Sequence, residues 1–226
     1  MVQLTIKYDS LHDAQCFVNF VLDIKEKFRY GRQPIDLEKK LRPILLPAYH
    51  SFTPLTSQEE KVKAFNKILS DPTQNDFDEI QKMADSTIFA WNEYGHKMID
   101  FLEKLYQKKF PFDYLTGLIE TNGYCGYSSD LALVGILFKA RMSRKFFCLL
   151  HELNHFMFHF CYGHLLPVLG EIRWHILKEA MITFSNPNSK GYPACQQIHS
   201  LFRANFRNYW KNLDQAVNAA LPLLYQ

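Results

Sequence analysis

The stretch that decides the fold runs from Ser143 to Tyr162 and reads SRKFFCLLHELNHFMFHFCY. Apolar residues lie on nearly all of its sides, which predicts a buried helix. Inside it stands H-E-x-x-H, formed by His151, Glu152 and His155, and residues four apart share one face of a helix. Polar side chains on a buried helix are costly unless a partner satisfies them. We therefore expect this helix to carry a site.

The spacing of His151 and His155 suits a metal ion. Two imidazoles one turn apart can bind a single Zn²⁺ through nitrogen, and Glu152 lies on the flank of the same face. There its carboxylate can take a proton from a metal-activated water and pass it to a leaving amine. The pattern thus predicts a zinc cofactor and amide hydrolysis, with Glu152 as the general base.

Zinc in a catalytic site needs a third protein ligand. His159 lies one further turn along the same face, whereas Cys161 stands where an extended metzincin pattern would require histidine. The following helix offers Glu171, His175 and Glu179, which are spaced by four and share one stripe. The spacing alone leaves these alternatives open.

The pair HELNH and LKEAMITF, the latter running from Leu177 to Phe184, resembles the gluzincin metallopeptidases, the thermolysin-like group. In that family a second helix supplies a Glu ligand about two dozen residues after H-E-x-x-H, followed by a small residue. The resemblance covers residues 114–184, and H-E-x-x-H is its specific part. It implies that His151, His155 and Glu179 bind zinc.

The chain departs from the gluzincin pattern at two positions. Lys178 stands where the family usually has Asn before the Glu, and Thr183 stands where it has Asp four residues after. The carboxylate that usually orients a ligand histidine is therefore not where it is expected. His175 is the rival third ligand, and we favour Glu179 on the local Glu-Ala match.

Two short segments, Tyr114–Thr121 and Leu131–Phe138, suit β-strands, and a glycine-containing loop separates them. We expect an α+β fold, mostly helical, with a small antiparallel sheet beside the H-E-x-x-H helix, as in zincins. The resemblance implies that Tyr114–Thr121 is the sheet edge along which a peptide binds. Leu131–Phe138 would then be the inner strand that leads into the helix.

The rest of the chain has helical periodicity and no internal repeat. Ser57 and Glu60 form a capping-box pattern at the start of one helix. We expect a helical N-terminal region, 1–109, and a zincin-like catalytic region, 110–226, in one compact unit. The further expected helices are Leu11–Phe28, Asp36–Leu45, Ser57–Leu69, Asp76–Gln107, Leu166–Phe184 and Pro193–Leu213.

Peptide hydrolysis also needs a donor for the developing oxyanion. Tyr192 is our choice, because the loop from Asn186 to Pro193 can return over the site. His199, Tyr124 and Tyr127 are the alternatives.

The composition of the chain limits the classes of binding partner that can be expected. The formal charge of +3 is too small to predict nucleic acid or an acidic membrane as the main partner. The sequence shows neither a signal-peptide pattern nor a long apolar run, and its five cysteines are scattered. We expect a cytoplasmic zinc metallopeptidase that acts on a peptide or protein, although hydrolysis of another amide or ester uses the same chemistry. The alternative is a catalytically inactive zincin-like protein that binds a protein partner or has a structural role.

Overall fold

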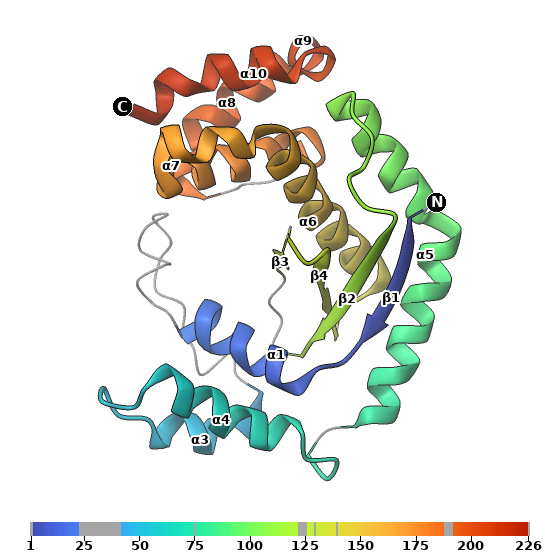
Figure 1. Cartoon of the computed structure of the whole chain (residues 1–226), viewed down its shortest axis with the longest axis vertical. Coiled ribbons are helices and arrows are strands. Elements are labelled where there is room, and N and C mark those ends of the chain that lie inside the picture. The colour runs from blue at the N-terminus through green and yellow to red at the C-terminus, as the bar shows by residue number, and fades with distance from the viewer. Residues whose placement is uncertain are drawn as a thin grey trace.

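The computed structural model describes residues 2–22, 42–74, 76–121, 126–128, 130–138, 140–187 and 192–225. Helices surround a small sheet, with the long helix α5 along one side and α6 behind the sheet (Figure 1). Helices α1, α3 and α4 gather at one end, and α7 to α10 gather at the other. The strands are β1 (Gln3–Lys7), β2 (Tyr114–Glu120), β3 (Tyr127–Ser128) and β4 (Leu133–Leu137). The α-helices are α1 (Ser10–Cys16), α3 (Leu46–Ser51), α4 (Gln58–Leu69), α5 (Phe77–Tyr106), α6 (Met142–Tyr162), α7 (Leu166–Met181), α8 (Gln196–Ala204), α9 (Phe206–Lys211) and α10 (Leu213–Ala220).

The sheet is mixed, in the order β1-β2-β4-β3. The expected antiparallel pairing of the two long strands is wrong, because β2 pairs with β4 in parallel, from Thr116 opposite Leu133 to Glu120 opposite Leu137. The chain reverses at β3, which lies in the segment expected to be a loop and pairs antiparallel with β4. Side chains of β2 and β4 are buried almost continuously, which is typical of parallel strands covered on both faces.

The expectation that Tyr114–Thr121 forms the sheet edge is also wrong. β2 lies inside the sheet, with β1 on one side and β4 on the other. β1 escaped the sequence analysis, although Gln3–Lys7 alternates exposed and buried residues as a half-buried strand does. The edges of the described sheet are β1 and β3, and β3 is the edge strand next to β4. The expectation that the strand Leu131–Phe138 is internal and leads into the buried helix is confirmed.

Most expected helices are present, with shifted boundaries. The capping box is confirmed, since Ser57 N–H donates to Glu60 and Glu60 N–H donates to Ser57 Oγ. The helix expected over Leu11–Phe28 is an α-helix to Cys16 and then a π-helical turn over Phe17–Leu22. Its remainder, and residues 36–41 of the next expected helix, lie outside the described residues. The helix expected over Pro193–Leu213 is broken into η5 (Pro193–Cys195) and the helices α8, α9 and α10.

Two groups of buried side chains hold these elements together. The larger one joins the sheet, α5, α6 and the C-terminal helices, so both expected regions contribute to it. In it, Trp91 of α5 donates its indole N–H to the carbonyl of Val2, 3.1 Å away, which fixes β1 against α5. The smaller group packs α1 and the π-helical turn after it against α4 through Ala14, Phe17, Phe65 and Leu69. Helix α6 is less buried than its composition indicates, because Phe147 and Phe160 are exposed.

A backbone break at Gly170 sets the course of α7. Its φ of 72° and ψ of 161° interrupt the helix four residues before Trp174. This region of backbone conformation is accessible essentially to glycine alone. The helix axis therefore changes direction at Gly170. The part of α7 after the break carries His175, Lys178 and Glu179.

We expect Gly170→Ala to destabilise the protein by about 1–3 kcal/mol, because a β-carbon strains this backbone conformation. Urea denaturation of the variant measures the loss. Glu171→Ala, an exposed neighbour in the same helix, is the control and should change stability by less than about 0.5 kcal/mol. Equal stabilities of Gly170→Ala and the parent protein would contradict the proposed role of the glycine.

Candidate metal centre

Helix α6 places the two histidines of H-E-x-x-H side by side. His151 and His155 are one turn apart, and their Nε2 atoms lie 3.0 Å from each other. The side chain of His155 is buried, whereas 27% of the His151 side chain is exposed. His155 therefore lies in the core, and His151 lies at the surface on the same side of the helix.

Glu179 of α7 meets this pair. Its Oε1 lies 3.3 Å from His155 Nε2, and its Oε2 lies 3.8 Å from His151 Nε2. All three ligand atoms lie within 4.8 Å of one another. Zinc bonds of about 2.0–2.1 Å in a tetrahedron place neighbouring ligand atoms about 3.3–3.4 Å apart. The structure thus brings together the three residues that the resemblance implied, at separations that fit zinc.

Buried polar contacts fix α6 against its neighbours. The hydroxyl of Tyr106 donates to Asn154 Oδ1, and Asn154 Nδ2 donates to Ser185 Oγ, 2.8 Å away. The indole N–H of Trp174 donates to the carbonyl of Tyr162 at 3.2 Å. These contacts join α6 to α5, to α7 and to the turn after α7, so they hold the histidine pair level with Glu179. The sequence analysis missed them, although the Asn inside H-E-x-x-H was a visible signal.

Glu152 is buried beside the histidine pair. Its Oε1 lies 4.0 Å from His151 Nε2, so it flanks the three converging ligand atoms without belonging to them. Burial raises the pKa of Glu152, and the nearby Lys178 ammonium opposes that effect. Glu152 therefore lies on the flank of the histidine pair, and its role as general base stays a prediction.

Charges around the site leave two of the proposed ligands in the forms that bind a metal. Burial alone would raise the pKa of Glu179, but His155, Lys178 and His151 hold that pKa well below its usual range. Burial, assisted by Lys178, holds the pKa of His155 well below its usual range as well. Glu179 is therefore ionised and His155 neutral at pH 7, as zinc ligands must be.

Lys178 is the unexpected member of this environment. Its side chain is buried, with Nζ 3.4 Å from Glu179 Oε1 and 4.9 Å from the centre of the Tyr127 ring. A fixed positive charge beside the ligand carboxylate works against binding of a second cation there. The departure from the family pattern at this position therefore has an electrostatic consequence.

Thr183, the second departure from the gluzincin pattern, also has a consequence in the structure. Thr183 forms a hydrogen bond with Nδ1 of the buried His199, 2.9 Å away. Within the described part of the chain, Nδ1 of His155 is buried and has no hydrogen-bond partner. Metal-binding histidines usually donate this second N–H to an oxygen. The donor set thus fits zinc, while the usual support for one ligand is not found among the described residues.

The alternative third ligands lie at different places. His175 Nε2 is 3.4 Å from Glu179 Oε1, but His175 is not one of the three converging residues. His159 packs against Trp174 instead, and Glu171 is exposed. The geometry favours Glu179 over these three.

The proposed oxyanion donors are spread around the centre. Tyr192 is half-buried, and its ring centre lies 6.3 Å from that of His175. Tyr127 of β3 lies closer to the ligands, with its ring centre 5.4 Å from that of His155. Tyr124 lies outside the described residues. The role of Tyr192 stays a prediction.

Comparison with known proteins adds nothing to this geometry, because no family model, curated protein or solved structure matches the chain. Among the helices that the structure describes, none combines the length and the apolar character that crossing a membrane requires.

We expect Glu179→Ala to weaken zinc binding far more than His175→Ala, because only Glu179 converges with the histidine pair. Competition with a chromophoric chelator measures the zinc affinity of both variants. Loss of zinc from His175→Ala with retention by Glu179→Ala would mean that three histidines bind the metal.

Proposed function

We propose that this protein is a zinc-dependent metallopeptidase that resembles the gluzincins. The observation that carries the proposal is the convergence of His151, His155 and Glu179 from two helices, with the buried carboxylate of Glu152 beside them. A site that only stabilises a fold has no need of a second carboxylate that does not bind the metal. The partial exposure of His151 leaves one side of the centre accessible.

Each residue of the centre has a separate task in this reaction. Bound zinc supplies an activated water and polarises the substrate carbonyl. Glu152 accepts a proton from the water and delivers it to the leaving amine. Tyr192 donates a hydrogen bond to the developing oxyanion. His175, which contacts Glu179, helps to hold that carboxylate in place.

The substrate we propose is a peptide or protein segment in extended conformation. β3 is one of the two edge strands of the described sheet, and its Tyr127 packs against His155. A segment that adds to this edge would form main-chain hydrogen bonds with β3 and pass close to the metal centre. The odd number of scattered cysteines leads us to place this activity in the cytoplasm.

Glu152→Gln should abolish peptide hydrolysis, with a loss of at least about 100-fold, because an amide cannot take the proton. Zinc content and thermal unfolding should stay unchanged. Glu171→Gln, an exposed glutamate in α7, controls for the loss of one charge and should keep full activity. A Glu152→Gln protein that cleaves peptides at the parent rate would exclude Glu152 as the base.

The second candidate function is that of a non-catalytic zincin-like module, which binds a protein partner or has a structural role. The observation that favours it is the buried Lys178 ammonium, which already neutralises the Glu179 carboxylate. A mixed peptide library incubated with zinc-loaded protein separates the two functions. Cleavage that ceases on chelation and returns with added zinc supports the peptidase, whereas a fully zinc-loaded protein that cleaves no peptide supports the module.

A further inference from the structure

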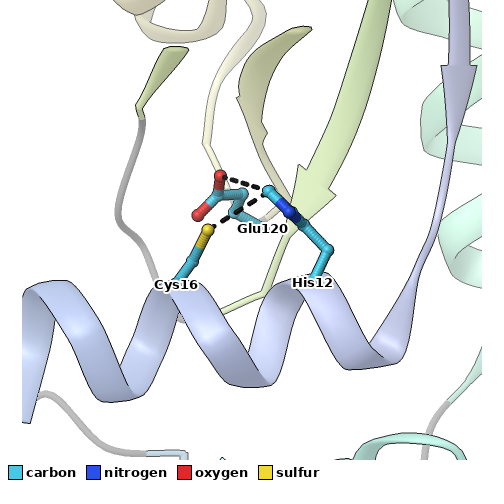
Figure 2. A group of neighbouring side chains, drawn as sticks. All are labelled: His12, Cys16 and Glu120. Carbon is cyan, nitrogen blue, oxygen red and sulfur yellow. Dashed lines mark hydrogen bonds and ion pairs between the residues drawn. The ribbon is translucent and has the colours of Figure 1, made fainter. Parts of the chain in front are cut away.

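A second group of metal-binding side chains lies where α1 meets the carboxyl end of β2. His12 and Cys16 are one turn apart on α1, and Glu120 is the last residue of β2 (Figure 2). Cys16 Sγ lies 3.2 Å from His12 Nε2, and Glu120 Oε1 lies 3.7 Å from the same nitrogen. The three ligand atoms all lie within 4.8 Å of one another.

We propose that His12, Cys16 and Glu120 form a second zinc site, separate from the H-E-x-x-H centre. Zinc binds imidazole nitrogen at about 2.0–2.1 Å, thiolate sulfur at about 2.3 Å and carboxylate oxygen at about 2.0–2.2 Å. In a tetrahedron these bonds place the ligand atoms about 3.3–3.6 Å apart. The two measured separations lie close to this range, and the thiolate favours zinc over magnesium or calcium.

The same atoms do not form a nucleophilic triad. In such a triad the carboxylate binds the ring nitrogen that does not face the nucleophile. Here Cys16 and Glu120 approach the same nitrogen, Nε2 of His12, so neither can orient the ring for the other (Figure 2). The nitrogen, sulfur and oxygen atoms of these three side chains converge, and a cation between them would contact all three.

The backbone around this second site is already fixed. Asp9 caps α1 by accepting the N–H groups of Leu11 and His12, at 3.0 and 3.1 Å. Asp13 accepts the N–H and the hydroxyl of Thr121, at 3.1 and 2.6 Å. Thr121 follows Glu120 directly, so these bonds hold the α1 ligands beside the strand ligand.

Burial differs among the three ligands in a way that suits a metal site. Only 3% of the Glu120 side chain is exposed, and Cys16 is buried as well, whereas 29% of the His12 side chain is exposed. The buried carboxylate and thiol both face Nε2 of His12, and the exposed side of His12 gives an ion access. Zinc bound there would join α1, which belongs to the smaller group of buried residues, to the central strand β2.

Cobalt(II) distinguishes this site from the first. The H-E-x-x-H centre has only nitrogen and oxygen ligands, so a thiolate-to-cobalt charge-transfer band in the near ultraviolet reports Cys16 alone. We expect the cobalt-loaded protein to show the band and to hold two ions per chain. Cys16→Ser should lose the band and one ion, while His151→Ala should lose one ion and keep the band.

Cys161→Ser is the matched control, because Cys161 is a half-buried thiol on α6 outside both groups, and it should keep the band. Circular dichroism of metal-free Cys16→Ser checks that this conservative variant folds. His12→Gln provides an independent variant and should also lose the band. Absence of the band from the parent protein, or its persistence in folded Cys16→Ser, would overturn the proposal. The band depends neither on peptidase activity nor on metal in the H-E-x-x-H centre, so failure of the proposed function would leave the band unaffected.

Discussion

The contact of the Glu179 carboxylate with the two histidines of α6 is the interaction on which the site depends. It brings charge and ring nitrogens into a region surrounded by Phe and Leu side chains, where unpaired polar groups are expensive. The surrounding structure supports it at several points. The Gly170 break sets the direction of the second part of α7. The hydrogen bonds of Asn154 fix α6 so that its two histidines lie beside Glu179. A shift of one turn in either helix would separate the ligand atoms.

The order of the strands in the sheet determines which strand lies next to the site. Because β2 and β4 run parallel, the chain has to return between them, and it does so through β3. This return places a short outer strand beside α6, with Tyr127 against His155. Because β1 already pairs with β2, a simple hairpin of the two long strands would have made β4 the edge on this side of the sheet. The direction of one strand pair thus decides where an extended peptide could approach the metal centre.

Electrostatics at the centre is less simple than the motif indicates. The ammonium of Lys178 stabilises the ionised form of Glu179, and together with burial it keeps His155 neutral. Both effects prepare the ligands, yet the same charge opposes an incoming cation. The zinc affinity of the proposed site would therefore reflect a balance between a favourable donor set and an unfavourable neighbour. A family pattern with Asn at this position would not have this conflict.

The sequence by itself determined the features that depend on local spacing. These are the histidine pair on α6, Glu152 beside it, the capping box of α4 and most of the helices, because helical periodicity fixes which residues share a face. The sequence also left a readable trace of β1 in the alternation of Gln3–Lys7.

Only the tertiary structure decided the features that depend on packing between distant segments. One stripe of α7 carries both His175 and Glu179, and the packing of α7 beside α6 brings Glu179 to the histidine pair. Strand direction and the order of the sheet depend on long-range pairing, which periodicity does not encode. Glu120 likewise meets His12 only because α1 docks at the end of β2 through Asp13 and Thr121. The local pattern thus specified the residue types of the candidate site, and the packing of helices and strands specified which residues share it.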